Sequence, residues 1–347
     1  MKKIFYFFAL LFIAIYSYNG YEMYKNSHLK VYNESKLSAI AEDIIAIPLE
    51  TKEECRIKKI EKVRATSSYL FIASQGRLFQ FTDKGKYIRQ ITPFSLTDFT
   101  IDTQHQRIIA IEQQHMVSYY DFNGNRLATQ DLSANPTWDK LHKIEFFHDS
   151  LWITADLLFQ DSSNPAIQRI ETHICRFDTE FNLLESQALS PANIGRPANE
   201  FFLTPEPVVT HQGEVYAFSP SMEPDYLLED TLFIAKTTVQ VNAGLIASGN
   251  LFPVRRSGRF MLANYRNRTD DPSSYAFCYD IKEHKAYYSK EGFKDDLLKT
   301  GTITDLCALN MQNTSFCFVK GSKDTYKLFP ERQEQDNPVV FIFNLKA

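Results

Sequence analysis

The sequence is poor in tryptophan and has no excess of positive charge. Only 2 of its 347 residues are Trp, and its formal net charge at pH 7 is −4. A negative balance of this size gives no general attraction to nucleic acid or anionic lipid. The chain also lacks basic runs, RNA-binding signatures and zinc-finger spacing. We therefore expect no nucleic-acid partner.

Signatures of several enzyme classes are absent too. The sequence has no Gly-x-Ser-x-Gly elbow, no Gly-rich phosphate loop and no His-Glu-x-x-His motif. The Asp-box of bacterial sialidases is missing, and the histidines are not spaced as metal ligands. No local motif therefore assigns a catalytic residue, a metal ligand or a cofactor.

The chain has 5 cysteines, an odd number that excludes a complete disulfide framework. Cys175 and Cys278 occupy equivalent places in two apolar runs, where we expect them to pack in the core as small apolar side chains. Cys307 and Cys317 flank an expected hairpin turn at residues 310–314. A disulfide between them is an open alternative, because the sequence does not fix the strand register.

Residues 1–18 resemble a targeting segment. Lys2 and Lys3 precede a nearly unbroken apolar run over residues 4–18, which is typical of a secretory signal or a signal-anchor. The run is shorter than the roughly twenty residues of a membrane-spanning helix. Only Ser17 and Gly20 are small residues near a cleavage point. Cleavage and retention both stay open, with a buried N-terminal helix as a third alternative.

This segment predicts where the protein works. We expect the body to be exported to the periplasm or the cell envelope. Membrane association is expected only through residues 4–18, and we expect a monomer. Residues 19–42 are polar and mixed, which favours a spacer between the targeting segment and a folded body at 43–347.

The dominant positive feature is a repeat of aromatic-rich apolar runs that end in polar turns. Aromatic residues make up 14% of the chain, including 28 Phe and 18 Tyr, and they suit pleated, half-buried strands. The runs recur at intervals of roughly fifty residues, a period that indicates a propeller when it is built on strands. The markers before the turns are Phe81, Tyr120, Phe177, Leu228, Tyr279 and Ile342. They predict an all-β, six-bladed β-propeller with four-stranded antiparallel blades.

The two ends of this array are expected to pair. The last apolar run, 339–345, lies at the third-strand position of its blade, which then lacks an outer strand. The orphan strand 44–49 can fill that place, satisfy an open β edge and close the ring. An open sandwich is the alternative, but it does not account for six markers.

Several segments resemble a bacterial six-bladed β-propeller family that is NHL-like and abundant in Bacteroidota. The segment Ile47-Pro48-Leu49-Glu50-Thr51 resembles the opening of that family, and residues 69–89 are similar to its first full blade. Residues 292–296 and 337–346 resemble a fifth-blade segment and the closing strand. The resemblance spans about residues 44–346 and implies the fold and export, but no particular chemistry.

Two departures limit what the resemblance implies. Members are often lipoproteins with a lipid-bearing cysteine straight after the apolar run, whereas the first cysteine here is Cys55. Lipid attachment is therefore not supported. The Gly- and Pro-rich stretch that commonly follows the first blade is also missing after Ile91, which leaves no role to assign to that loop.

The Asp, Asn and Gly residues of the repeat are expected to form turns. Asp83-Lys84-Gly85 and Asn123-Gly124 follow apolar runs, and Gly and Asn accept the left-handed backbone that hairpins need. A calcium site is the alternative for these residues.

Candidate binding residues lie in the irregular segments between the repeats. Trp138, beside Pro136 in a loop, is a candidate sugar-stacking platform, whereas Trp152 is expected in the core. An arginine-rich cluster can bind carboxylates or sugar hydroxyls, because Arg offers planar paired donors; a solvated loop with mutual ion pairs is its alternative. The members of this cluster are Arg255, Arg256, Tyr265, Arg266, Arg268 and Asp270.

Two functions from different classes follow. The first is a non-catalytic propeller that binds a protein, peptide or glycan ligand on one face of the ring, where loops of all blades meet. The second is a metal-dependent enzyme of the lactonase or lyase type, with its site at the mouth of the central channel. The enzyme needs carboxylate, Asn or His side chains that converge from several blades. We favour binding, because no catalytic signature is concentrated anywhere and a fold implies no activity.

Overall fold

The computed structural model describes residues 30–32, 35–93, 95–133, 138–160, 167–195, 206–209, 215–218, 231–234, 237–240, 249–251, 255–257, 259–267, 274–280, 282–283, 285–289, 292–303, 306–310 and 315–346. The targeting segment 1–18, the marker Leu228 and the candidates Arg268 and Asp270 lie outside these residues. Within them, no helix is long and apolar enough to cross a membrane.

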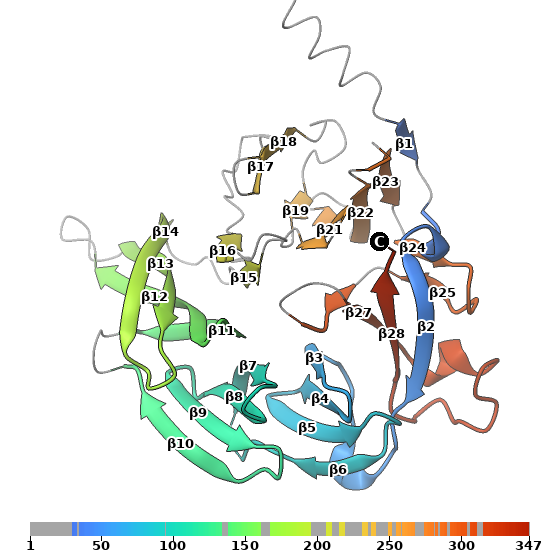
Figure 1. Cartoon of the computed structure of the whole chain (residues 1–347), viewed down its shortest axis with the longest axis horizontal. Coiled ribbons are helices and arrows are strands. Elements are labelled where there is room, and N and C mark those ends of the chain that lie inside the picture. Colours follow the sequence, from blue (N-terminus) through green and yellow to red (C-terminus); the bar gives the residue numbers. More distant parts are fainter. Residues whose placement is uncertain are drawn as a thin grey trace, which may run out of the picture.

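The first half of the described chain forms three antiparallel sheets of four strands each. The first sheet contains β3 (Lys62–Ala65), β4 (Tyr69–Ser74), β5 (Arg77–Thr82) and β6 (Tyr87–Gln90). The second contains β7 (Leu96–Asp102), β8 (Arg107–Glu112), β9 (Met116–Asp121) and β10 (Arg126–Asp131). The third contains β11 (Lys140–Phe147), β12 (Ser150–Gln160), β13 (Ile167–Phe177) and β14 (Leu183–Gly195). The sheets follow one another side by side in chain order (Figure 1).

The second half contributes two larger sheets and three small ones. A six-stranded sheet combines β1 (Lys30–Tyr32), β19 (Gly249–Leu251), β20 (Arg255–Ser257), β21 (Phe260–Asn267), β22 (Ser274–Asp280) and β23 (Lys285–Ser289). A four-stranded sheet combines β2 (Ala41–Pro48), β26 (Cys307–Ala308), β27 (Ser315–Lys320) and β28 (Val339–Leu345). The pairs are β15 (Glu206–Val209) with β16 (Val215–Phe218), β17 (Thr231–Ile234) with β18 (Thr237–Gln240), and β24 (Phe293–Asp295) with β25 (Gly301–Ile303).

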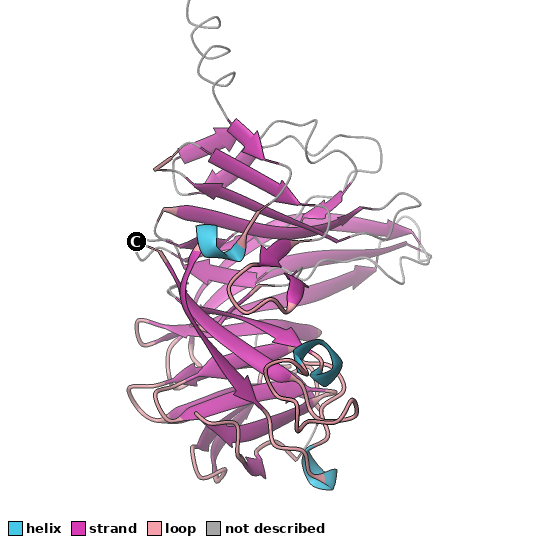
Figure 2. Cartoon of the chain, turned by 90° about the vertical axis from the view of Figure 1, so that its right-hand side faces the viewer, coloured by secondary structure: helices cyan, strands magenta, loops and turns pink. Residues whose placement is uncertain are grey.

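Helical structure in the described part is limited to three short 3₁₀ segments, η1 (Leu37–Ala39), η2 (Glu53–Cys55) and η3 (Ser322–Thr325). The fold is thus all-β, as the composition predicts. Seen from the side, strands of successive sheets lie above one another and the helical turns sit at the periphery (Figure 2).

The repeat markers fall on the same kind of strand in each sheet. Phe81 lies on β5, Tyr120 on β9 and Phe177 on β13, which are the third strands of their sheets. Ile342 on β28 is likewise one strand from the outer edge of its sheet, and Tyr279 on β22 lies in the middle of the six-stranded sheet. The predicted antiparallel, four-stranded repeat is therefore confirmed for four of the described sheets.

Strands in the middle of the array are buried on both faces. On β4, Leu70 and Ile72 pack toward β28, while Phe71 and Ala73 pack against the second sheet. On β8, alternate residues divide in the same way between the first and third sheets. A strand covered on both faces needs an apolar side chain at nearly every position. This requirement explains the continuous runs Tyr-Leu-Phe-Ile-Ala in β4 and Ile-Ile-Ala-Ile in β8.

The two ends of the array pair as predicted. β2 runs antiparallel to β28, with Ile47 opposite Val340 and Ile44 opposite Phe343. Buried Asn337 reinforces this junction: its side-chain amide donates to the carbonyls of Glu50 and Cys55 at 2.7 and 2.8 Å. The N-terminal strand therefore completes the sheet of the last strands, from three residues earlier than the sequence suggested.

The segment expected as a polar spacer contributes to the fold. Within 19–42, Lys30–Tyr32 forms β1 and pairs parallel with β23. Leu37 and Ile40 are fully buried in a core cluster with β21, β22 and β28. The folded body therefore begins before residue 43. Two apolar side chains in a polar stretch give too weak a periodicity to announce this burial.

Cysteines occupy the expected positions. Cys175 on β13 and Cys278 on β22 are both fully buried in core clusters. Burial raises the pKa of the Cys175 thiol to about 12. Cys307 on β26 lies directly opposite Cys317 on β27, so the register that a cross-strand disulfide requires is present.

The acidic residues of the repeats close turns with their own backbone. Asp121 accepts hydrogen bonds from the N–H groups of Asn123 and Asn125 at 2.9 and 2.8 Å. Asp178 does the same with Glu180 and Asn182. In both turns the Asn side chain donates to the second carboxylate oxygen. These contacts favour the turn over the calcium alternative.

Gly85 in the β5–β6 turn is a sensitive point, because it touches the end of β2. Its φ is +78°, and a Cβ there would lie 2.2 Å from the Pro48 carbonyl oxygen. We predict that Gly85→Ala lowers the free energy of unfolding by about 2–3 kcal/mol through left-handed strain and backbone displacement. Urea unfolding measures the change.

Gly124→Ala is the matched control. Gly124 has a similar φ of +82°, but its added Cβ would meet only side chains, Arg89 at 3.2 Å and Ile91 at 3.5 Å. Gly124→Ala should lower the free energy of unfolding by about 1 kcal/mol, which is the penalty for left-handed backbone alone. Equal losses in the two variants would contradict the contact between Gly85 and β2.

Candidate functional site

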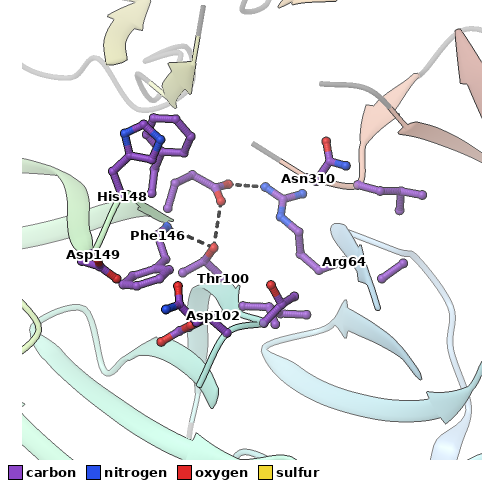
Figure 3. Close-up of a pocket in the computed structure, with 14 residues that line it drawn as sticks. Arg64, Thr100, Asp102, Phe146, His148, Asp149 and Asn310 are labelled. Atoms are coloured by element: carbon purple, nitrogen blue, oxygen red, sulfur yellow. Dashed lines mark hydrogen bonds and ion pairs between the residues drawn. The ribbon is translucent and has the colours of Figure 1, made fainter. Parts of the chain in front are cut away.

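A pocket of about 310 Å³ lies where the first strands of four sheets come together. These strands are β3, β7, β11 and β26, each at the edge of its sheet. Figure 3 shows the side chains that line the pocket. The lining residues are Arg64, Ala65, Thr100, Ile101, Asp102, Thr103, Gln104, Glu145, Phe146, Phe147, His148, Asp149, Leu309 and Asn310.

The floor of the pocket is built from polar residues at alternate strand positions. Lys62 and Arg64 alternate with apolar residues on β3, and Asp98, Thr100 and Asp102 do so on β7. Side chains two residues apart project from the same face of a strand. Each first strand therefore presents a polar row, although its other face packs in the core.

These rows meet in a buried ion network centred on Glu145 of β11. Lys62 Nζ lies 2.8 Å from Glu145 Oε1 and 2.9 Å from Asp98 Oδ2. Arg64 donates to Glu145 through Nη2 and to the Ala308 carbonyl through Nη1, the latter at 2.7 Å. Figure 3 shows the Arg64 guanidinium directed at this carboxylate. The network joins β3, β7, β11 and β26.

Hydrogen bonds from Thr100 and the β11 backbone complete the network. Thr100 Oγ1 donates to Glu145 Oε2 at 2.9 Å and accepts from the Phe146 N–H at 3.3 Å. The Asp98 carboxylate accepts from the Ile144 N–H at 2.9 Å. A buried charge is tolerated when its remaining lone pairs are satisfied in this way.

The network strongly favours the ionised form of Glu145. Burial alone would raise the pKa of this carboxyl group. The charges of Arg64 and Lys62, with hydrogen bonds from Lys62 and Thr100, outweigh burial and lower the pKa from 4.5 to about 2. Glu145 therefore stays an anion at neutral pH and holds both cations in place.

Asp102, at the end of β7, is a second buried carboxylate with its own partners. Burial raises its pKa, but hydrogen bonds from Arg107 and His105 outweigh this and bring the pKa below its usual value. Arg107 Nη2 lies 2.7 Å from Asp102 Oδ2, and the His105 N–H donates to Oδ1 at 3.0 Å. Both oxygens are thus occupied by groups of the chain.

The rim of the pocket combines aromatic rings with exposed polar groups. Phe146 is half-buried, and the His148 ring stacks on Phe147 with centroids 3.9 Å apart. His148 and Asp149 form the two-residue turn between β11 and β12, with φ of 46° and 52°. Left-handed backbone at two non-glycine residues is strained, and such strain occurs preferentially at functional sites.

The two buried carboxylates that line the pocket already have partners within the chain. Asp102 and Glu145 already receive cations and hydrogen bonds from the chain. Within the described residues, no group of three or more His, Cys, Asp or Glu side chains could hold a metal ion. The groups that remain available to a ligand are the aromatic, hydroxyl, amide, imidazole and carboxylate groups of the rim.

Trp138 lies away from this pocket. Its side chain is 2% exposed and packs in the core between the second and third sheets. Its ring meets the His173 ring edge-on, with centroids 5.3 Å apart. Trp152 is half-buried beneath the Arg176 guanidinium. The sequence suggested a loop position for Trp138 and a core position for Trp152. In the structure Trp138 is buried and Trp152 is half-buried.

The arginine-rich cluster is spread along β21. Arg255 and Arg256 pair with Leu262 and Met261, near one end of β21, whereas Tyr265 and Arg266 pair with β19 near the other. None of these four residues lines the pocket, and their side chains lie outside the described part of the structure. With Arg268 and Asp270, they stay a prediction.

Sequence reasoning missed the residues of the pocket floor. A usable signal was present: in each repeat the first strand places charged residues at every second position, as in Lys62-Val63-Arg64 and Lys143-Ile144-Glu145. Buried charges that alternate with apolar residues on a strand must find partners on neighbouring strands or sheets.

Comparisons with known proteins agree with this architecture. The model of the DUF5128 family, described as a 6-bladed beta-propeller, matches residues 21–151. A search of curated proteins finds no match.

Solved structures give a wider likeness. A protein of Bacteroides fragilis NCTC 9343, named as a candidate exported protein, matches with a TM-score of 0.63 and 16% identity, over 92% of this chain and 98% of that one. The Cps50 (Swd1) beta-propeller domain of Myceliophteria thermophila matches with a TM-score of 0.44 and 10% identity, over 86% and 100% of the two chains. The first match shows a fold shared with the Bacteroides protein, and the family match identifies that fold as a β-propeller. The NHL-like part of the resemblance stays a prediction.

The Glu145 network generates a pH-dependent prediction. A carboxyl group whose pKa falls from 4.5 to about 2 on folding stabilises the folded state above the unfolded pKa. This stabilisation, on the order of 3 kcal/mol, disappears as the pH falls from 4.5 toward 2. Glu145→Gln should therefore be several kcal/mol less stable than the wild type at pH 7. The difference should shrink steadily below pH 4.5.

Urea unfolding of both proteins between pH 7 and pH 3 measures this difference. Glu53→Gln, at an exposed position on η2, is the control and should follow the wild type throughout. A stability difference between the wild type and Glu145→Gln that does not change with pH would contradict the ionised network.

Proposed function

We propose that this chain is an exported, non-catalytic β-propeller that binds a protein, peptide or glycan ligand in the pocket between β3, β7, β11 and β26. One observation carries the proposal: four sheets contribute to a single pocket whose buried charges are already paired. Such a pocket is rigid, concave and lined by aromatic and polar groups, which is typical of ligand sites.

The size and position of the pocket support this function. A volume of about 310 Å³ lies at the lower end of the roughly 300–1,000 Å³ of small-molecule sites. It suits one compact group, such as a sugar unit or a peptide side chain. The remainder of a larger ligand would then lie over the exposed turns that carry Gln104 and His148.

The proposal includes a six-bladed ring that closes through its ends. The pairing of β2 with β28 supports closure, and the family match supports six blades. In such a ring the first strands line the central channel, which places the pocket at one mouth of that channel. Ligands of propellers then meet loops from several blades at once.

Export is supported by the N-terminal sequence and by one structural neighbour. Lys2 and Lys3 precede the apolar run at residues 4–18, and the Bacteroides fragilis protein of similar fold is named as a candidate exported protein. We place the protein in the periplasm or cell envelope, as a monomer. Where the apolar run is retained, the protein is attached to the membrane only through that segment.

The enzyme alternative has less support at this pocket. A lactonase- or lyase-type site needs carboxylate, Asn or His groups that remain available to a metal ion. Here Arg64 and Lys62 hold Glu145, and Arg107 holds Asp102. A metal ion would first have to displace these buried cations.

We predict that ligands from a panel of glycans and peptides raise the melting temperature, and that Phe146→Leu abolishes this shift. Phe146 lines the pocket, and Leu retains most of its volume while removing the aromatic face. Thermal shift and calorimetric titration of the purified protein measure binding.

Phe122→Leu is the matched control. Phe122 is another half-buried aromatic residue, packed on Phe71 with ring centroids 5.2 Å apart, and it does not line the pocket. It should bind ligands like the wild type. Binding that survives Phe146→Leu unchanged, or calcium or zinc at unit stoichiometry in metal analysis, would overturn the proposed function.

A further inference from the structure

We propose that the pocket selects a neutral saccharide unit and discriminates against acidic sugars and other anions. The inference rests on the proposed function, since it names which of the three ligand classes the pocket takes. Its basis is the balance of charge around the pocket, together with the chemistry of the groups that the balance leaves over.

The paired charges in and next to the pocket cancel; of the six groups, Arg64, Asp102 and Glu145 line the pocket itself. Three cations, Lys62, Arg64 and Arg107, are joined to three carboxylates by ion pairs. The carboxylates are Asp98, Asp102 and Glu145. Every pair is buried on at least one side, where charge–charge interactions are little screened. An approaching anion therefore meets no net positive field.

Arg64 is the residue that would otherwise clamp an acidic ligand. Arginine binds carboxylates through two parallel N–H groups. Here Nη2 donates to Glu145 and Nη1 to the carbonyls of Ala308 and Val63. The remaining guanidinium nitrogen, Nε, has no hydrogen-bond partner among the described residues but is buried. An acidic ligand could therefore gain the guanidinium only by displacing Glu145, which would leave a second buried carboxylate without its main partner.

The groups left over fit a hydroxylated ring. Thr103, Gln104, His148 and Asp149 are exposed at the rim and supply hydroxyl, amide, imidazole and carboxylate partners. Asp149 is the one rim carboxylate, and it accepts hydrogen bonds from hydroxyl groups but repels anions. Beside them lie Phe146 and the stacked pair of Phe147 with His148.

A sugar ring has the complementary surface. Its hydroxyl groups are directed outward and each can donate and accept, while its C–H groups form an apolar face that packs on aromatic rings. A neutral sugar therefore uses both the polar rim and the aromatic side of the pocket without a charge to compensate. A cationic peptide group would use Asp149 alone.

Matched pairs of sugars test the inference on the purified full chain. Calorimetric titration compares glucose with glucuronate and galactose with galacturonate, as free sugars and as disaccharides, beside a panel of short peptides. Each pair differs only in a carboxylate. We expect the neutral member to bind at least tenfold more tightly.

Two variants assign the effect to the rim. Asp149→Asn removes the repelling charge and should narrow the difference between neutral and acidic sugars. His148→Asn keeps a residue that tolerates left-handed backbone and should weaken the binding of neutral sugars severalfold. Asp83→Asn, at an exposed carboxylate in the β5–β6 turn outside the pocket, should change neither the affinity for neutral sugars nor the difference between neutral and acidic sugars.

The outcomes separate this inference from the proposed function. Acidic sugars that bind as tightly as neutral ones, or peptides that bind when neutral sugars do not, would overturn the saccharide inference. If that binding still depends on Phe146, the proposed function stands. If no sugar and no peptide binds, both fail.

Discussion

The constraint on which the structure depends is that each middle sheet is covered on both faces by its neighbours. Phe71 and Ile72 are adjacent on β4, yet they belong to two different cores. Each pair of neighbouring sheets therefore shares its own apolar layer, worth roughly 25 cal/mol for every Å² removed from water. In the first two sheets, charged side chains then lie in turns, at strand ends, on the outer strands and on the first strands, where the sheets converge. The location of the pocket follows from this placement.

At the convergence, polarity has two different uses. Lys62, Arg64, Asp98 and Glu145 neutralise one another and connect separate sheets, so they act as internal ties. The rim residues of the β11–β12 turn face solvent and remain available. The same distinction separates Asp102, which is buried and paired with Arg107 and His105, from exposed Asp149. A pocket whose charged groups already pair with one another recognises a ligand by shape and hydrogen bonds.

Much of the fold could be predicted from sequence because its signals are local. Apolar runs and turn residues such as Gly85 depend on a few neighbouring positions, and pairing of the two ends followed from counting strands. The candidate site could not be predicted in this way. Glu145 meets Arg64 across 81 positions, and Arg64 meets Ala308 across 244. Burial of Trp138 and Leu37 was missed for the same reason, because distant sheets cover them.

The junction of β2 with β28 also affects how the chain reaches its folded state. Ile47 and Val340 are neighbours in space, but the ribosome adds them to the chain at widely separated times. β2 must therefore wait, with its backbone groups unpaired, until β28 arrives, and contacts of such separation form slowly. Meanwhile the edge it will cover is exposed, and open edges invite pairing with other chains. Assembly thus depends on the late arrival of β28, so truncations that remove this strand are more damaging than their length suggests.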